Sequence, residues 1–287
     1  MAQSPSHKFG QIIGDLLEDA IFPILSDFCQ TNNLYLDYKH ERPARRGKKV
    51  TWNDKYGNKH DLDFVFEKDG SEFVQGQPVA FVECAWRRYT KHSRNKAQEI
   101  QSAILPLFDT FMYIKPFLGV ILAGVFTEGA LTQLKSRGFS VLYFPFETII
   151  TAFKKVGIDS DFNESTSDKS FDGKVKAFYD LSPDKYSTLK NELLNQNSES
   201  VQTFINELNS HFERKISAIK IFTLHGKSNS YLSISDAIKF ISTYNIVDMC
   251  NYYFHRFEII VKYTNNDKIE AQFSNKDEAI NFLERLV

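Results

Sequence analysis

The stretch PVAFVECAW, residues 78–86, is a nearly continuous apolar run of strand length. Such runs lie in the middle of a sheet whose two faces are both covered, so this stretch predicts a central strand. Glu83 interrupts the run, and an ionised carboxylate placed there costs on the order of several kcal/mol unless a cation or hydrogen-bond donors meet it. Five cationic residues follow within 13 positions of Glu83, namely Arg87, Arg88, Lys91, Arg94 and Lys96. The run therefore predicts a positively charged partner for Glu83.

Two further acids precede this strand in the segment HDLDFVF. Because strand side chains alternate between faces, Asp61 and Asp63 share one face, and either can converge with Glu83 across neighbouring strands. Carboxylates that meet at one point repel one another, and Mg²⁺ or Mn²⁺ relieves that repulsion through oxygen ligands. We favour Asp63, since three apolar residues follow it. A turn-capping Asp63, and a Glu83 that pairs with a nearby arginine without metal, are the alternatives.

A second basic cluster lies directly before the segment that carries Asp63. Its members are Arg42, Arg45, Arg46, Lys48 and Lys49. Both clusters are expected to border the acids, although each by itself is also typical of a solvated charged face. Carboxylates that hold a metal, surrounded by cations that hold a backbone, describe a phosphodiester site. The predicted nucleic-acid contacts are this cluster together with Arg87, Arg88 and Arg94.

Helical and strand patterns alternate around the central strand. Before it, apolar spacing predicts a helix over 7–29, bent near Pro23, then a basic loop and a hairpin. After it come, in order, a helix from Ser93 or Asn95, a buried strand at 119–126, a short helix at 127–138 and a strand at 139–146. This order is a βαβ unit, which makes part of the sheet parallel.

The polar, glycine-bounded segment 158–173 predicts a linker. We therefore expect a first domain over residues 1–157 and a smaller C-terminal α+β domain over 174–287. Residues 217–243 and 256–285 share the layout strand, turn, strand, helix, and their helices open at Asp236 and Glu278, 42 residues apart. This similarity predicts a ββα unit used twice, with chance similarity as the alternative because many helices open with an acid.

Composition excludes several classes of protein. A formal net charge of -1 argues against coating nucleic acid by bulk charge. Cys29, Cys84 and Cys250 form no CxxC pair, which disfavours a disulfide framework or a structural zinc site. No apolar stretch is long enough to span a bilayer, and no HExxH or phosphate-loop motif is present. We expect a cytoplasmic protein without a membrane segment.

The order of these elements and acids resembles the PD-(D/E)xK nuclease superfamily of restriction endonucleases and junction resolvases over residues 8–157. The closing strand, TEGA helix and strand are similar to its Mrr-like branch. The resemblance implies a restriction-endonuclease-like mixed sheet flanked by helices, with Asp63 as the motif aspartate and Glu83 as the motif glutamate. It also implies that Glu18, in GDLLEDAI, is a further metal contact, although an ordinary exposed helix acid is the alternative.

The sequence departs from the family at Ala85, where the motif has a lysine. Some members supply the missing group from the next helix, and Lys96 shares a helical stripe with Ile100 and Leu107, which places its amine near the end of the Glu83 strand. Lys91, in the connection, is the competitor. One of these two lysines is expected to orient the attacking water.

These patterns lead to the hypothesis of a Mg²⁺- or Mn²⁺-dependent DNA endonuclease of restriction or anti-phage defence. Duplex DNA is the substrate by resemblance, and a homodimer or a larger complex suits double-strand cutting. A catalytically silent nuclease-fold module that binds nucleic acid, and a structure-selective nuclease or ribonuclease, are the alternatives. The C-terminal domain is expected to serve recognition, dimerisation or docking.

Overall fold

The computed structural model describes residues 4–223, 228–246 and 254–286. The chain forms two compact units. Unit 1 comprises residues 1–110 and 116–207, and unit 2 comprises residues 111–115 and 208–287. The fold is therefore a mixed α/β unit with a second, smaller unit.

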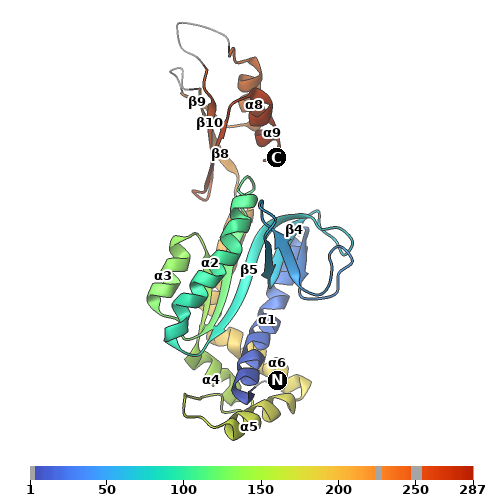
Figure 1. The fold of residues 1–287 in the computed structure, drawn as a ribbon, viewed down its shortest axis with the longest axis vertical. Coiled ribbons are helices and arrows are strands. Elements are labelled where there is room, and N and C mark those ends of the chain that lie inside the picture. The colour runs from blue at the N-terminus through green and yellow to red at the C-terminus, as the bar shows by residue number, and fades with distance from the viewer. Residues whose placement is uncertain (1–3, 224–227, 247–253, 287) are drawn as a thin grey trace. The chain divides into compact units, whose positions relative to one another are not determined.

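Unit 1 is built on a five-stranded sheet in the order β1-β4-β5-β6-β7 (Figure 1). The strands are β1 (Leu34–Tyr38), β4 (Phe64–Lys68), β5 (Gln77–Arg87), β6 (Phe117–Gly124) and β7 (Ser140–Pro145). β4 runs antiparallel to its neighbours β1 and β5, whereas β5, β6 and β7 are parallel. The predicted central strand is confirmed as β5. The sheet is mixed because the antiparallel pair β4–β5 is followed along the chain by βαβ crossovers, which make β5, β6 and β7 parallel.

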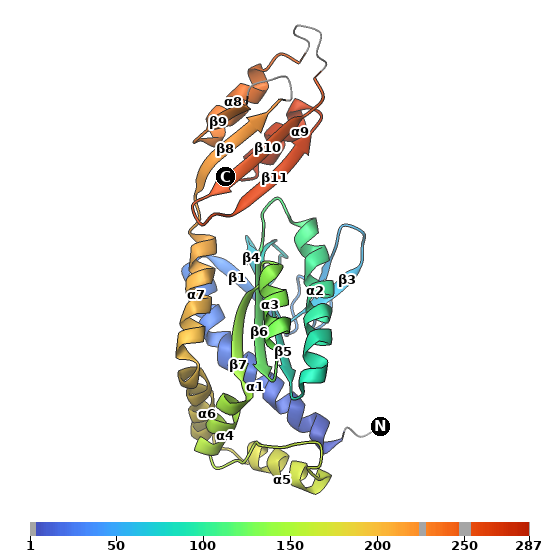
Figure 2. The same ribbon diagram turned by 90° about the vertical axis from the view of Figure 1, so that its left-hand side faces the viewer.

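Helices cover both faces of this sheet. The helices before residue 160 are α1 (Pro5–Thr31), α2 (Ser93–Thr110), α3 (Glu128–Ser136) and α4 (Phe146–Lys155), and a 3₁₀ turn (Thr90–His92) leads into α2. Figure 2 shows α2 and α3 on one face, with α1 on the other. The Ser4 side chain caps α1 by accepting from His7 N, and Pro23 lies inside the helix, which continues past it. The apolar stripe predicted over 7–29 is the buried face of α1, from Phe9 to Cys29.

The chain ahead of β4 forms a separate two-stranded sheet of β2 (Val50–Asn53) and β3 (Lys59–Leu62). Asp63 occupies a bend between β3 and β4. The sequence pattern predicted one strand through this position, and the bend divides it into two. The bend separates Asp61, which stays on the exposed β3, from Asp63, which lies at the start of the central sheet.

The predicted domain boundary at Gly157 and the predicted linker over 158–173 are wrong, because unit 1 continues to Glu207. The segment carries apolar side chains that are buried, with Phe162 packed against Phe9 and Phe146 at ring-centroid distances of 5.9 Å. Three helices follow it, α5 (Asp168–Tyr179), α6 (Pro183–Gln196) and α7 (Ser198–Phe212). α5 packs on α1 and α6 packs on α4, so the predicted linker is part of the unit 1 core.

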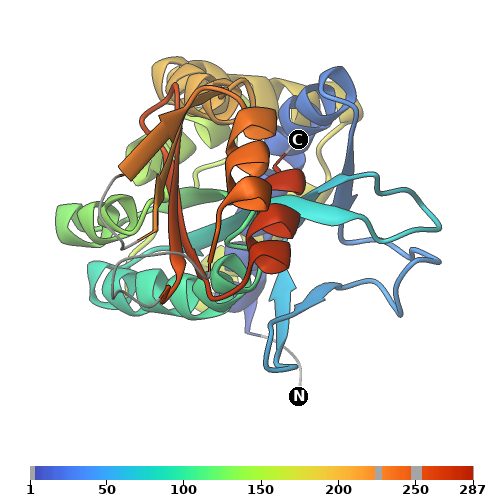
Figure 3. The same ribbon diagram turned by 90° about the horizontal axis from the view of Figure 1, so that it is seen from above.

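Unit 2 is a four-stranded antiparallel sheet in the order β11-β10-β8-β9. Its elements are β8 (Ile216–Phe222), β9 (Ser228–Tyr231), α8 (Ile234–Thr243), β10 (Phe257–Tyr263), β11 (Lys268–Phe273) and α9 (Lys276–Glu284). They form two successive ββα units, and Figure 3 shows α8 and α9 side by side along one face of the sheet. Ser233 and Asn275 cap the two helices by accepting from Asp236 N and Glu278 N. Residues 224–227 of the first predicted repeat lie outside the described residues.

Cys29 and Cys84 carry free thiols, and Cys250 lies outside the described residues. Within the described ranges, no helix combines the length and the apolar character that crossing a membrane requires.

Candidate active site

Asp63 is fixed to the end of β5 by a backbone hydrogen bond. The β4–β5 register begins at the pair Phe64–Val82, so residues 83–87 of β5 extend beyond the end of β4. Cys84 N, which has no β4 partner there, donates to Asp63 Oδ2 at 2.7 Å. This bond brings the Asp63 carboxylate next to Glu83 and supports the choice of Asp63 over Asp61, whose carboxylate is exposed and pairs with Lys49 Nζ at 2.6 Å.

Glu83 has a buried carboxylate with little neutralisation. Its side chain is 14% exposed, and Lys96 Nζ lies 3.7 Å from Oε1. Among the described residues, Glu83 Oε2 has no hydrogen-bond partner. Burial and then the charge of Asp63 raise the pKa of Glu83 to about 8, although Lys96 opposes that rise. The predicted cation partner of Glu83 is therefore Lys96, and one carboxylate oxygen still needs a partner.

Glu18 on α1 shares this acidic environment. Burial and then Asp63 raise the pKa of Glu18 to about 7, and Lys39 opposes that rise. Burial also raises the pKa of Asp63, against the stabilising effects of Cys84 N and Lys96. Because each carboxylate raises the cost of ionising another, the three acids form one electrostatic group contributed by α1, the β3–β4 bend and β5.

These residues fit a hard divalent cation. In the parts of the chain that the structure describes, no three His, Cys, Asp or Glu residues form a ready cage for a metal ion. Mg²⁺ is commonly held by one or two carboxylates and keeps several waters, so it does not need such a cage. The unpartnered Glu83 Oε2 and the repulsion between Glu83 and Asp63 are the features that a bound cation would relieve.

The two candidate lysines lie in different environments. Lys96, in the first turn of α2, is 18% exposed and lies beside Glu83. Lys91 is 61% exposed and pairs with Glu164 at 3.1 Å. Ala85 is buried at 6% exposure and brings no charge to the strand. The geometry therefore favours Lys96 as the lysine that serves the acids.

Arg42 and Arg45 are not surface cations, which corrects the prediction that they contact nucleic acid. The Arg42 side chain is 0% exposed and pairs with Asp37 at 2.8 Å and with Glu67 at 2.6 Å. Arg45 is 5% exposed and also pairs with Asp37. The sequence signal was available, because Asp37 and Glu67 lie in apolar strands and buried acids require cations.

Arg42 also shapes the β4–β5 loop. Its guanidinium donates to Ser71 O and Val74 O, so it orders the loop from inside.

The other members of the Arg42 cluster, Arg46, Lys48 and Lys49, are exposed, as is Arg94. Of the residues predicted to contact nucleic acid, these four and the partly exposed Arg87 remain available to an external ligand within the described chain.

Arg88 is engaged in packing. Its Nε donates to Phe162 O at 2.9 Å, and its guanidinium lies 3.9 Å from the Phe146 ring centroid. Arg88 therefore anchors the segment predicted to be a linker rather than projecting freely.

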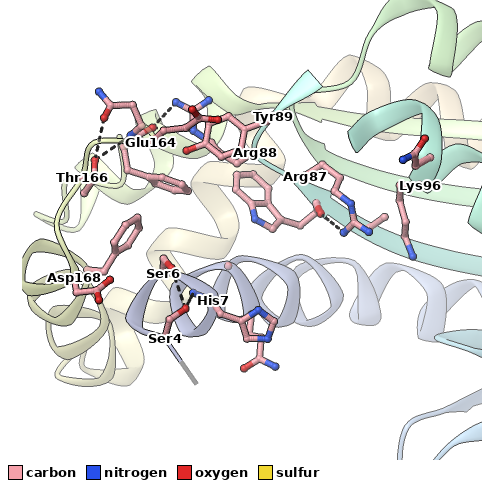
Figure 4. A pocket seen from close by; sticks show the side chains of 18 of the residues that line it. Ser4, Ser6, His7, Arg87, Arg88, Tyr89, Lys96, Glu164, Thr166 and Asp168 are labelled. Carbon is pink, nitrogen blue, oxygen red and sulfur yellow. Dashed lines mark hydrogen bonds between the residues drawn. The ribbon is translucent and has the colours of Figure 1, made fainter. Parts of the chain in front are cut away.

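A cleft of about 1010 Å³ opens beside Lys96 (Figure 4). Lys96 lines this cleft, as does Cys84 next to Glu83, whereas Asp63, Glu83 and Glu18 are not among its lining residues. The cleft lies between the start of α1, the end of β5, the start of α2 and residues 162–171. In Figure 4, Arg87 and Lys96 lie together on the side of the cleft away from Asp168. Sequence reasoning missed Trp86 and Tyr89 as lining residues, although each lies within a few positions of a predicted one.

The fold and this site define an α/β protein with a buried carboxylate–lysine centre beside a cleft lined by both cationic and acidic side chains. No family model matches the chain, and no curated protein matches it. A solved crystal structure of a protein of unknown function, AF1548, covers 67% of this chain and 99% of its own at 9% identity, with a TM-score of 0.29. A likeness at that TM-score supports neither a fold assignment nor a function.

Proposed function

We propose that this protein is a metal-dependent endonuclease that hydrolyses DNA phosphodiester bonds in restriction or anti-phage defence. The observation that carries the proposal is the pairing of two buried acids, Asp63 and Glu83, with Lys96 at 3.7 Å from Glu83. Buried carboxylates with raised pKa values, next to a lysine in a cleft, are typical of catalytic rather than structural positions.

Asp63 and Glu83 would hold Mg²⁺ or Mn²⁺, with Glu18 as a further contact from α1. The cation would supply a polarised phosphoryl oxygen and a water of lowered pKa. Cys84 N holds Asp63 in place, so the carboxylate needs no reorganisation to act as a ligand. Lys96 orients the attacking water from α2, in the role that the missing lysine at position 85 would have had.

The cationic side chains that remain exposed, Arg46, Lys48, Lys49 and Arg94, would hold the DNA backbone together with Arg87. Unit 2, with its paired ββα units, would serve recognition, dimerisation or docking, as a homodimer or as part of a larger complex.

A catalytically silent module that binds nucleic acid is the second candidate. Two observations favour it: Ala85 stands where the family has a lysine, and no ready three-ligand cage exists among the described residues. Cleavage and binding separate the two candidates, because the silent module keeps binding and has no metal-dependent cleavage.

The test compares cleavage of supercoiled plasmid, linear duplex, single-stranded DNA and RNA in EDTA, Mg²⁺ and Mn²⁺. Wild type is compared with Glu83→Gln and Asp63→Asn, and Asp61→Asn is the matched control because Asp61 is exposed and two residues away. We expect a loss of roughly 100-fold or more in the first two variants and near-normal activity in the control. Intact binding with no cleavage by wild type would establish the silent module, and a substrate preference for RNA or branched DNA would establish the structure-selective alternative.

A further inference from the structure

Glu99 on α2 lies between two cations from different elements. Its Oε2 is 3.4 Å from Arg87 Nη2 and 3.7 Å from Lys96 Nζ. The Glu99 side chain is 59% exposed, whereas Arg87 is 33% exposed and Lys96 is 18% exposed. The two cations are thus recessed in the wall of the cleft, and the carboxylate covers them from the solvent side.

Both cations are held in position from behind. Arg87 Nη1 donates to Trp86 O at 2.8 Å, and Arg87 O accepts from Val125 N at 2.7 Å. Gly124 permits that second contact, because its φ is +99° and a Cβ there would collide with Arg87 O. Lys96 is oriented by Glu83. Two preorganised cations therefore converge on one position for an anionic oxygen.

A phosphodiester suits this position better than Glu99 does. A guanidinium presents a planar fork that matches phosphate oxygens, and a lysine ammonium adds a point charge. An exposed carboxylate gains little from surface ion pairs, so its displacement costs little. We propose that Arg87 and Lys96 form a subsite for a nucleic-acid backbone phosphate, and that Glu99 occupies this subsite as an internal competitor which the phosphate displaces.

The inference rests on the proposed function, because it takes a nucleic-acid strand as the ligand. Glu164, which lines the same cleft and pairs with Lys91, provides a contrast. The Lys91–Glu164 contact is a single ion pair at 3.1 Å with side chains 61% and 69% exposed, which is an ordinary surface pair. Glu164 therefore offers the same charge change as Glu99 without a bridging position.

The test measures binding of a short fluorescein-labelled DNA duplex and of its single strand in EDTA, so that no cleavage occurs. The variants are Glu99→Gln, the control Glu164→Gln, Arg87→Ala, and Arg87→Ala combined with Glu99→Gln. We expect Glu99→Gln to tighten binding about threefold or more and Glu164→Gln to change it less. Arg87→Ala should weaken binding, reduce the slope of log K against log salt by about 1, and remove the gain from Glu99→Gln.

The proposal is overturned if Glu99→Gln and Glu164→Gln give equal gains, because net charge alone then explains them. It is also overturned if the Glu99→Gln gain persists without Arg87, or if neither wild type nor Glu99→Gln binds DNA. If the variants show the predicted binding pattern but wild type cleaves no substrate, the proposed hydrolytic function is wrong and the phosphate subsite is still supported. Cleavage by wild type without that pattern would remove the subsite alone.

Discussion

Lys96 Nζ lies 3.7 Å from Glu83 Oε1, and neither side chain is more than 18% exposed. The lysine reaches the acid from α2, whereas the strand position two residues after Glu83 is Ala85. Among the described residues, one carboxylate oxygen of this buried ion pair has no partner. Such a pair contributes little to the stability of the fold, because the cost of burying the charges is not fully offset.

Lys96→Ala is expected to lower metal-dependent cleavage by about 100-fold or more, since positioned proton-transfer and orienting groups contribute about that much. Lys91→Ala should retain most activity, because Lys91 pairs with Glu164 away from the acids. Single-turnover cleavage rates provide the measurement. Ala85→Lys in the Lys96→Ala background should restore part of the rate, and an equal loss in Lys91→Ala would contradict the assignment.

Unit 1 should lose stability as pH rises from about 4.5 to about 8 in EDTA. The folded pKa of Glu83 is about 8 and the ordinary pKa of a glutamate is 4.5, so over this range the folded state holds more protons than the unfolded state and stability falls with pH. The Glu83 contribution is on the order of a few kcal/mol. Urea unfolding followed by tryptophan fluorescence reports unit 1, because both Trp52 and Trp86 lie there.

Glu83→Gln is the matched comparison for this pH series. It should flatten the slope, and Mg²⁺ should restore stability to wild type chiefly at the alkaline end, where the carboxylates are ionised. Identical slopes in wild type and Glu83→Gln would show that Glu83 ionises normally.

Arg42→Ala should destabilise unit 1 by about 3–5 kcal/mol, because it leaves Glu67 buried without its cation and removes one of the two arginines that pair with Asp37. Arg46→Ala, in the same basic segment but exposed, should change stability by less than about 0.5 kcal/mol. The same fluorescence assay measures both variants. A stable Arg42→Ala protein with weakened DNA binding would instead return Arg42 to the nucleic-acid contacts.

Unit 2 should show the opposite pH dependence. Burial and then Arg214 lower the pKa of His211 to about 3, with Lys115 acting in the same direction and Asp267 opposing them. Between about pH 3 and 6.5, the ordinary pKa of a histidine, the unfolded state binds the extra proton, so stability falls as pH falls through this range. Hydrogen exchange of unit 2 peptides, corrected for intrinsic rates, should show earlier opening at acid pH in wild type than in His211→Asn. Equal opening in both proteins would contradict a neutral, buried His211.

The local sequence pattern was sufficient to predict the core helices and strands of unit 1. The apolar run around Phe81, the helical stripe from Phe9 and the βαβ order appear in the structure because burial periodicity and strand length are properties of short segments. The ββα layout of unit 2 was predictable for the same reason. The prediction of a linker over 158–173 was wrong because most residues around Phe162 are polar. The apolar contacts that Phe162 makes depend on packing against distant segments, which the local sequence does not show.

Charge was predictable in amount but not in location. The sequence alone determined that Glu83 needs a cation and that Arg42 to Lys49 form a basic segment, since composition and alternation are readable residue by residue. Only the tertiary structure decided that Lys96 meets Glu83, that Arg42 is buried against Asp37 and Glu67, and that Glu99 bridges Arg87 and Lys96. The physical reason is that an ion pair depends on a few ångströms between side chains from different elements, and those distances are set by how helices and strands pack rather than by their order in the chain.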